Sequence, residues 1–252
     1  MHTVQVIPVT GLPIIREGDR LAKLICDASD NQKTPIQDGD VIVITHVVAA
    51  RAEGATVNLD TIQPSPFAQH IARKTGKDPA LVEVVLKEAE SIIRMRNGSI
   101  ITLTKHDLIC ANSGVDKSNV PGDRTVALLP EDPDHSAKQI RQEIKQQTGK
   151  TVAIIISDTH GRPLRDGEIN IAIGVAGIAP LRDRRGDTDL FGYTLKIKRT
   201  AVADELASAA ELVIGQAKEA IPVAIIRGYP YQPSEEATLK DMLRPLEKEY
   251  FL

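Results

Sequence analysis

The sequence predicts an α+β fold with mixed, mainly antiparallel sheets and flanking helices, built as a single domain over residues 1–252 or as two intertwined lobes within it. Short β-branched runs bounded by turn residues, such as residues 41–44, predict strands that are buried on both faces. Longer segments with apolar residues at helical spacing predict amphipathic helices. The two kinds of segment are mixed without the regular alternation of a doubly wound fold, which favours α+β over α/β.

The first half of the chain begins with a strand and then mixes helices with further strands. Strands are expected at residues 4–9, 41–44, 99–103 and 107–111, and the last two form a hairpin. Helices are expected at residues 19–28, 64–76 and 79–95. The last of these helices carries an apolar stripe that core packing explains without any function: Leu81, Val84, Val85, Ala89 and Ile92.

The second half contains the clearest strand of the chain, residues 151–156, which is a run of Thr, Val, Ala and Ile. Further strands are expected at residues 195–200 and 223–227, and an apolar segment rich in Gly and Ala spans residues 169–178. Helices are expected at residues 201–215 and 132–148, the latter capped by Asp134 or Ser136 and ended by Gly149. A polar tail with a short amphipathic helix begins at about residue 229.

The composition is that of a soluble globular protein, with 42% hydrophobic and 26% charged residues. A formal net charge of -3 gives no basic field that would attract nucleic acid, and an aromatic content of 3% gives few platforms for stacking bases. No apolar run reaches the length of a membrane span, and the N-terminus shows no charged segment followed by an apolar one. We therefore expect a cytoplasmic protein without a membrane or nucleic-acid partner.

The chain has two cysteines, Cys26 and Cys110, and each follows an apolar stretch. Their wide separation and the expected reducing compartment favour buried free thiols over a disulfide. Two thiols are also too few for a metal site that is built on thiolates.

The first candidate site is the polar segment at residues 157–162, which directly follows the strand at residues 151–156. Asp158 and Thr159 supply two hard oxygen donors in sequence, and Mg²⁺ or Mn²⁺ is usually held by one or two carboxylates together with water and substrate phosphate. Arg162 could bind phosphate through bidentate hydrogen bonds. The alternative is an ordinary turn in which the aspartate accepts hydrogen bonds from its own backbone.

The second candidate is the loop at residues 111–119, which also follows an apolar strand and contains Asp116. An ordinary Asn/Gly/Asp turn is the alternative, but two such loops after two strands favour one shared site. A third segment, Arg51 to Gly54, could place a cation against phosphate or form a solvated charge pair. No Walker A motif, G-x-G-x-x-G fingerprint or G-x-S-x-G elbow is present, which argues against the common kinase, NAD-enzyme and esterase classes.

Taken in order along about 220 residues, a set of short motifs resembles the coenzyme F420-0:gamma-glutamyl ligase family. The motifs are Gly11-Leu12-Pro13-Ile14, Asp38-Gly39-Asp40-Val41, Arg51-Ala52-Glu53-Gly54, Asn112-Ser113-Gly114-Val115-Asp116-Lys117-Ser118-Asn119, Ser157-Asp158-Thr159-His160-Gly161-Arg162, Ile171-Ala172-Ile173-Gly174, Ala203-Asp204-Glu205 and Ile214-Gly215-Gln216. Each motif is weak by itself, whereas their order and spacing are specific.

The resemblance implies an enzyme that uses GTP to join L-glutamate to a deazaflavin coenzyme precursor, F420-0. The implied mechanism phosphorylates the acceptor carboxylate to an acyl phosphate, which the glutamate amine then attacks. It also implies two Mn²⁺ or Mg²⁺ sites, a K⁺ ion and a homodimer. The alternative is a metal- and GTP-dependent phosphotransferase or ligase that acts on another phosphorylated acceptor.

Carried over by position, the resemblance assigns Asp116 and Asp158 to one metal, and Thr159 and Gln216 to a second. We expect catalysis to depend on Asp116, Asp158 and Arg162. The implied nucleotide contacts are Gly11, Leu12, Pro13, Ile14, His46, Val47, Arg51, Asn119 and Gly215. The chain departs from the family pattern at Ala50-Arg51, where Ser-Lys is usual.

Overall fold

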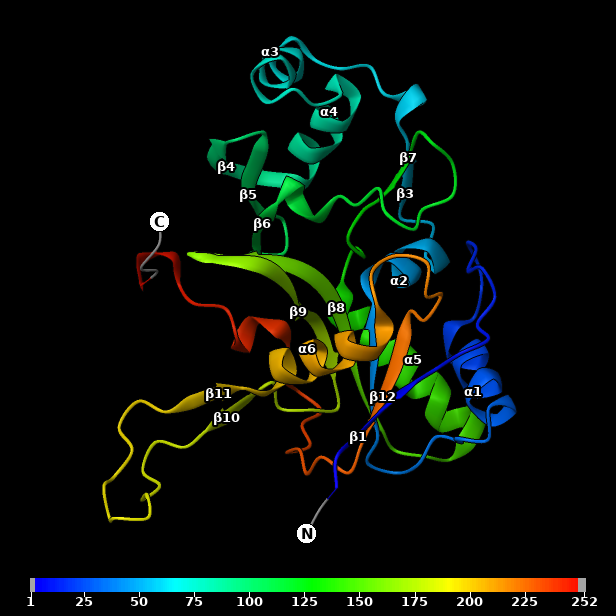
Figure 1. Ribbon diagram of the computed structural model, residues 1–252, viewed down its shortest axis with the longest axis vertical. Coiled ribbons are helices and arrows are strands. Elements are labelled where there is room, and N and C mark those ends of the chain that lie inside the picture. The colour runs from blue at the N-terminus through cyan, green and yellow to red at the C-terminus, as the bar shows by residue number, and fades with distance from the viewer. Residues whose placement is uncertain (1–2, 249–252) are drawn as a thin grey trace.

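The centre of the fold is a mixed sheet in a computed structural model that describes residues 3–248, the side chain of Leu246 excepted (Figure 1). Its strands lie in the order β1 (Gln5–Pro8), β12 (Val223–Arg227), β2 (Val41–Thr45), β8 (Ala153–Arg162) and β9 (Arg165–Ala176). β2 and β8 run parallel, whereas the other neighbours in this sheet are antiparallel. The predicted α+β class with mainly antiparallel pairing is confirmed.

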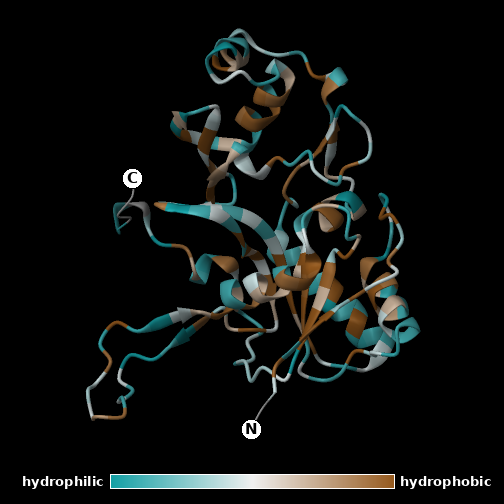
Figure 2. Cartoon of the chain, viewed as in Figure 1, coloured by the Kyte–Doolittle hydropathy of each residue, from teal (hydrophilic) through white to brown (hydrophobic). Residues whose placement is uncertain are grey.

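Helices cover both faces of this sheet. α1 (Leu21–Asn31) and α5 (Pro133–Thr148) pack on one face, where they meet Ile42, Ile44, Ile154 and Ile156. α6 (Val202–Ile214) packs on the other face against Val41, Val43, Ala153 and Ile155. Because no face of β2 or of the first half of β8 meets solvent, both strands read as continuous apolar runs, which are brown in Figure 2.

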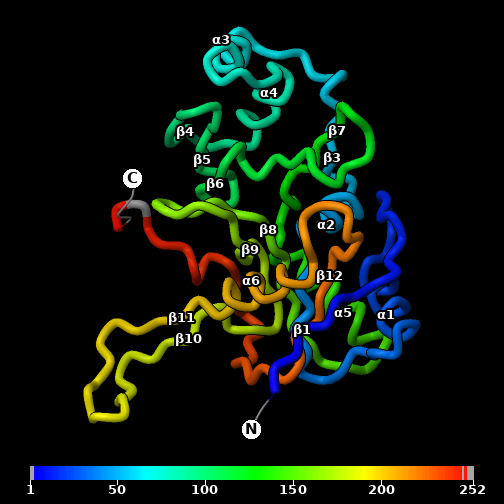
Figure 3. Tube along the Cα trace, in the orientation of Figure 1, coloured from blue at the N-terminus to red at the C-terminus, as the bar shows by residue number. Residues whose placement is uncertain are grey.

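A second group of elements lies beyond one end of the central sheet, and its chain path is followed most easily in Figure 3. The chain enters it from α2 (His46–Ala52) through β3 (Thr56–Asn58) and returns through β7 (Thr125–Ala127), which pairs with β3. Between them come η1 (Leu59–Thr61), α3 (Pro66–Thr75), α4 (Pro79–Glu88), β4 (Ala89–Arg96), β5 (Ser99–Thr104), β6 (Ile109–Ala111) and the short turn η2 (Asn112–Gly114). This lobe has apolar clusters of its own, for example around Ile71, Val85 and Ile100.

The helix predicted for residues 79–95 is wrong in its second half. α4 ends at Glu88, and Ala89–Arg96 form strand β4, which pairs antiparallel with β5. Helical spacing of apolar residues continues to Ile92, but the β-branched Ile92 also suits a strand, and pairing with Thr102 decides its conformation. The hairpin expected just after it is present as β5 and β6.

The start of α5 also differs from the prediction. The helix cap is Asp132, whose carboxylate accepts the backbone N–H of His135 at 2.9 Å. Asp134 instead accepts the backbone N–H of Val175 at 2.7 Å and that of Leu239 at 3.0 Å, so it ties α5 to β9 and to the C-terminal segment. Gly149 ends the helix in the left-handed conformation with φ 72°, as expected.

The strand predicted for residues 195–200 is largely absent from the described residues. The named strands here are only β10 (Leu181–Asp183) and β11 (Arg199–Ala201), which pair with each other. The chain between them forms an arm that projects from the body and is joined across by the isolated bridge of Thr188 with Thr194 (Figure 1). The alternation that suggested a strand meets no core, since Ile197 is 88% exposed. Up to residue 248, where the described residues end, the C-terminal segment contains the short 3₁₀ turns η3 (Leu239–Asp241) and η4 (Leu246–Lys248) and no α-helix.

Two terminal predictions fall partly outside the described residues. Residues 249–252 of the expected polar tail are outside them, and so are Met1 and His2 of the N-terminus. Within the described range, no helix has both the length and the apolar character that a membrane crossing would require.

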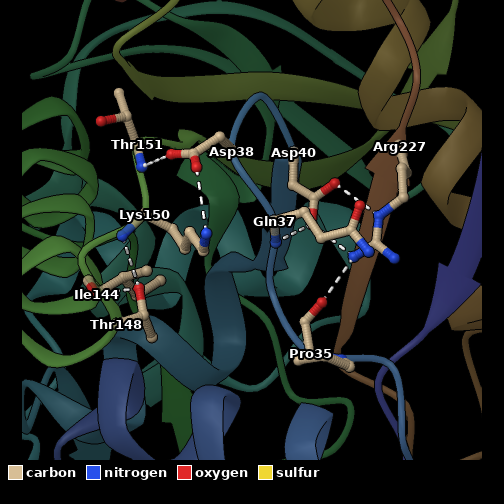
Figure 4. Close-up of polar contacts among 9 residues, drawn as sticks. All are labelled: Pro35, Gln37, Asp38, Asp40, Ile144, Thr148, Lys150, Thr151 and Arg227. Atoms are coloured by element: carbon tan, nitrogen blue, oxygen red, sulfur yellow. Dashed lines mark hydrogen bonds and ion pairs between the residues drawn. The ribbon is translucent and has the colours of Figure 1, made fainter.

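A polar cluster fixes the turn that precedes β2 (Figure 4). The carboxylate of Asp40 is 1% exposed and accepts two hydrogen bonds from Arg227, from Nε at 2.9 Å and from Nη2 at 2.7 Å. Arg227 also donates to the carbonyl of Pro35 at 2.8 Å. On the other side of the same turn, Asp38 accepts the backbone N–H of Thr151 at 2.8 Å and pairs with Lys150. The turn is therefore tied to both β12 and the start of β8, the two neighbours of β2.

We predict that Arg227→Met lowers the free energy of unfolding by about 3–5 kcal/mol, because it leaves the buried Asp40 carboxylate without a countercharge. Urea denaturation measured by circular dichroism gives the change. The matched control is Lys150→Met, whose partner Asp38 is 63% exposed and stays solvated after the change. Equal losses in both variants would contradict the special role of the buried pair.

We also predict that neither cysteine reacts in the native protein. Burial, together with the charge of nearby aspartates, raises the pKa of Cys26 to about 11 and that of Cys110 to about 12. At pH 8 the thiolate of Cys26 is then about one part in a thousand or less, so a thiol reagent such as DTNB should label fewer than one site until urea is added. Rapid labelling of either thiol in the folded protein would show that the cysteine is accessible.

Candidate functional site

A cavity of about 450 Å³ lies where β2 ends and β8 continues. Its walls come from residues 12–15, from the β2–α2 junction between residues 45 and 51, and from the segment between residues 116 and 121. The remaining walls are residues 157–159 of β8, Asn170 of β9 and the loop between residues 214 and 222 that follows α6. Segments far apart in the sequence therefore meet at one place.

The continuation of β8 is what exposes its polar residues to the cavity. β2 stops at Thr45, the partner of Ser157, whereas β8 goes on to Arg162 in a hairpin with β9. The segment predicted to be a loop after the strand, residues 157–162, is thus part of the strand itself. The reason is the pairing with β9, which a single strand sequence does not reveal.

A β-bulge in β9 sets which residues face each other across this hairpin. Ile156 pairs with Gly174, but the next residue, Ser157, pairs with Ala172, so β9 carries one extra residue. Gly174 is required here because a Cβ would lie 2.5 Å from the backbone of Pro133. The bulge brings Asn170 opposite Thr159; without it, the register would place an isoleucine there.

Asp158 extends toward α2, where it meets His46. The Nδ1 atom of His46 lies 3.1 Å from Oδ1 of Asp158, and that same oxygen accepts the backbone N–H of Thr159 at 2.7 Å. His46 is 3% exposed, and burial alone would lower its pKa. The pKa of His46 is nevertheless raised, because four interactions together outweigh burial. They are the charge of Asp158, the hydrogen bond to Asp158, the charge of Asp116 and the hydrogen bond to the backbone of Ser157. His46 therefore lies in the field of two carboxylates, and its Nε2 has no hydrogen-bond partner among the described residues.

Asp116 is held in place by its own short turn and by β7. Its two carboxylate oxygens accept the backbone N–H of Ser118 at 2.7 Å and the Ser118 hydroxyl at 2.8 Å. Its backbone exchanges two hydrogen bonds with Ala127, which makes an isolated bridge beside β7. The segment predicted to be a free loop is thus anchored to the second lobe at its aspartate.

Arg51 ties three walls of the cavity together. Its guanidinium donates to the carbonyl of Asn119 at 3.2 Å and to the carbonyl of Ile15. Asn119 in turn donates from Nδ2 to the carbonyl of Gln216 at 3.4 Å. Burial lowers the pKa of Arg51, and Asp19 opposes that shift. The Arg51 guanidinium therefore links α2 to the segments around Ile15 and Asn119, and it also lines the cavity.

A second polar network occupies the opposite face of β8, toward α6. Thr159 donates its hydroxyl proton to Oδ1 of Asn170 at 3.1 Å, and Asn170 donates from Nδ2 to Glu211 at 2.7 Å. Gln216 donates from Nε2 to the other oxygen of Glu211 at 2.5 Å. Burial raises the pKa of Glu211, the hydrogen bond from Gln216 opposes that rise, and the charge of Glu219 adds to it.

Asn170 and Glu211 were not among the residues predicted from the sequence. Asn170 is a polar residue at the start of an apolar, Gly- and Ala-rich segment, which is the one signal that marks it. Glu211 lies on the last turns of a helix whose other face is apolar, so nothing in its spacing distinguishes it from a solvated charge. Gly215 ends α6 with φ 70° and ψ 168°, a conformation that favours glycine, and it brings Gln216 back toward Glu211.

Most of the predicted site residues line this one cavity. They are Leu12, Pro13, Ile14, His46, Val47, Arg51, Asp116, Asn119, Asp158, Thr159, Gly215 and Gln216. Gly11 precedes the lining segment without belonging to it. Arg162 lies at the far end of β8, outside the lining, where its Nη2 donates to the carbonyl of Asp166 at 3.0 Å. The β8–β9 hairpin carries Arg162 away from the two aspartates because β8 is extended over its whole length.

The donors in the cavity fit a hard divalent cation in their chemistry. Two carboxylates, Asp116 and Asp158, lie beside His46, and Thr159 and Gln216 add neutral oxygens. In the part of the chain that the structure describes, no group of three or more His, Cys, Asp or Glu residues is arranged to enclose a metal. A cation bound here would therefore complete its shell with water and with oxygens of the substrate, as Mg²⁺ does at phosphate sites.

Comparison with known proteins identifies the family. The profile of the family described as F420-0:Gamma-glutamyl ligase matches residues 10–228. A protein named Coenzyme F420:L-glutamate ligase from Methanothermobacter thermautotrophicus is 46% identical over 249 residues, which cover 98% of each chain. Proteins with the same name from Methanopyrus kandleri and Methanocaldococcus jannaschii are 49% and 48% identical, over 90% and 95% of this chain and 88% and 94% of their own lengths. The chain belongs to the F420-0:gamma-glutamyl ligase family.

Proposed function

We propose that this chain is a ligase that uses GTP to join L-glutamate to the deazaflavin coenzyme precursor F420-0 through an amide bond. The observation that carries the proposal is the cavity in which Asp116 and Asp158 converge beside His46, within a chain that matches the ligase family over residues 10–228. The names of the relatives support the glutamate and coenzyme substrates. The hard oxygen donors support a metal-assisted reaction of a nucleotide triphosphate.

The proposed reaction has two steps. In the first, an acceptor carboxylate oxygen attacks the γ-phosphorus of GTP, the bond to the β–γ bridging oxygen breaks, and an acyl phosphate and GDP form. In the second, the glutamate amine attacks the acyl carbon, the carbon–oxygen bond to phosphate breaks, and the amine loses a proton as the amide forms. The apolar walls near Leu12, Ile15 and Val47 would exclude water, which would otherwise hydrolyse the acyl phosphate.

The residues around the cavity have separate proposed roles. Asp116 and Asp158 would hold one Mn²⁺ or Mg²⁺, and Thr159 and Gln216 would hold the second. Bound cations would neutralise charge on the triphosphate during transfer. Arg51 and Asn119 would keep the walls around the nucleotide in register, since they already hydrogen-bond across three segments. His46 would hold Asp158 through Nδ1.

Three further properties are proposed from the family resemblance. We propose that K⁺ is a second, monovalent activator, that the enzyme is a homodimer, and that it acts in the cytoplasm. The exposed apolar side chains of the β10–β11 arm, such as Leu190 and Phe191, are compatible with a surface that is covered in an assembly.

The proposed reaction is tested by incubating the protein with F420-0, L-glutamate, GTP and Mn²⁺ and analysing the products by mass spectrometry. We expect a product heavier by one glutamate residue, with GDP and phosphate formed in equal amounts. Omission of GTP or of the metal should abolish it. GTP cleavage without a glutamate adduct would favour a phosphotransferase or ligase that acts on another phosphorylated acceptor. The absence of both the adduct and GTP cleavage would refute the proposal.

We predict that Asp158→Asn lowers kcat by about 100-fold or more, because a neutral amide gives up most of the metal stabilisation of the transferred phosphate, which amounts to several kcal/mol. Steady-state kinetics at saturating Mn²⁺ give the ratio. The control is Asp166→Asn, the same change at an exposed position near the start of β9, which should leave kcat unchanged. Thermal unfolding should be similar for both variants; full turnover by Asp158→Asn would remove this residue from the metal site.

A further inference from the structure

Glu211 stands behind the cavity wall and receives hydrogen bonds from two residues of that wall. Its Oε2 accepts from Nδ2 of Asn170 at 2.7 Å, and its Oε1 accepts from Nε2 of Gln216 at 2.5 Å. Glu211 itself is half-buried on α6 and does not line the cavity. Whatever it contributes to the site must therefore act through Asn170 and Gln216.

A carboxylate can only accept hydrogen bonds, so Glu211 fixes which way each amide is turned. The amide of Asn170 must point its nitrogen at Glu211, which leaves its Oδ1 to accept the Thr159 hydroxyl proton at 3.1 Å. The amide of Gln216 must likewise point its nitrogen at Glu211, which leaves its carbonyl oxygen directed elsewhere. Asn170 is 2% exposed, so water does not compete for its orientation. Gln216 is exposed, so the hydrogen bond to Glu211 is what favours its orientation over the reverse one.

The direction of this hydrogen-bond chain determines the polarity of the wall. The proton of Thr159 is committed to Asn170, so the remaining groups that Thr159 can offer to the cavity are oxygen lone pairs. The free side of Gln216 is likewise an oxygen. A wall of oxygen lone pairs attracts a cation, whereas the reverse orientations would present O–H and N–H groups, which repel one.

The fold builds this arrangement from three elements. The bulge in β9 places Asn170 opposite Thr159, and the Ser208 hydroxyl donates to the carbonyl of Asn170 at 2.8 Å, which fixes that residue against α6. Gly215 then turns the chain so that Gln216 returns to Glu211, five residues earlier. Neither contact follows from helical spacing alone.

We propose that Glu211 is a positioning residue that orients Asn170 and Gln216 so that Thr159 and Gln216 present oxygen lone pairs to a divalent cation. The proposal rests on the proposed function, since it concerns the second metal of that site. It predicts that the negative charge and full acceptor character of Glu211 matter, and not its bulk.

The direct test is Glu211→Gln, which keeps the size of the side chain but replaces one acceptor oxygen by an N–H₂ donor. One of the two neighbours must then turn its amide over to avoid facing a donor. If Asn170 turns, the Thr159 hydroxyl proton points into the cavity; if Gln216 turns, its N–H₂ group does. Either outcome removes one oxygen donor from the cation site.

Binding of Mn²⁺ to the protein alone is followed by the electron paramagnetic resonance signal of free Mn²⁺. We expect Glu211→Gln to weaken the affinity by about 10–100-fold, the usual effect of changing a residue that orients metal ligands. The matched control is Glu205→Gln, the same substitution on an exposed position of the same helix, which should bind as the wild type does. Thermal unfolding of each variant checks that it is folded, and Glu211→Asp, which shortens the reach but keeps the charge, replaces Glu211→Gln if the latter does not fold.

Exchanging the two side chains between positions 211 and 216 gives a second test. Its Mn²⁺ affinity would not recover if Glu211 had only a structural role. In Glu211→Gln combined with Gln216→Glu, the new amide at 211 can donate to the new carboxylate at 216 and still accept from Asn170. We expect the double variant to bind Mn²⁺ at least about 10-fold more tightly than the product of the two single effects, because the pair is restored only when both are changed.

The outcomes separate this inference from the proposed function. Wild-type affinity in Glu211→Gln, or strictly additive effects in the double variant, would overturn the role of Glu211 while leaving the ligase proposal intact. Absence of Mn²⁺ binding by the wild type would overturn both the metal site and the role of Glu211. Weakened binding in Glu211→Gln with non-additive recovery in the double variant supports the inference.

Discussion

The parallel pairing of β2 with β8 positions the two cavity walls that carry His46 and Asp158. β2 is covered on both faces and ends at Thr45, where α2 begins with the buried His46. β8 continues beyond that point because β9 supplies its next partners, so the edge of β8 that faced β2 becomes free at Asp158. The Asp158 carboxylate therefore contacts His46, the first residue of the helix that follows β2, and both side chains line the cavity.

The fold class followed from the sequence because buried β-branched runs and apolar helical stripes are local signals. The errors came where pairing between distant segments decides the conformation. Residues 89–96 carry part of a helical stripe but pair with β5. Residues 195–198 alternate as a strand does, but only scattered backbone hydrogen bonds join them to residues 184–187 and no core lies beneath them. Residues 157–162 looked like a loop because polar residues follow an apolar strand, whereas their hydrogen bonds go to β9.

The candidate site divides in the same way. Asp116, Asp158, Thr159 and Gln216 stand in recognisable motifs, and the structure brings all of them to one cavity. Asn170 and Glu211 could not be found in this way, because their contacts depend on a bulge in β9 and on the turn after α6. Arg162 is close to Asp158 in sequence but lies outside the cavity lining, because the extended strand carries it away, and its catalytic role stays a prediction.

Strand alternation explains how two neighbouring residues come to serve different environments. Side chains of successive strand residues leave on opposite faces, so Asp158 reaches His46 and the field of Asp116, while Thr159 reaches Asn170 on the α6 side. The environment of Asp158 carries the formal charges of two carboxylates. The environment of Thr159 offers neutral oxygens, and its carboxylate, Glu211, acts only through Asn170 and Gln216. The two cations of the proposed function would then differ in how strongly the protein itself neutralises them. The more weakly neutralised one would depend more on substrate phosphate, and on the orientation that Glu211 gives to its ligands.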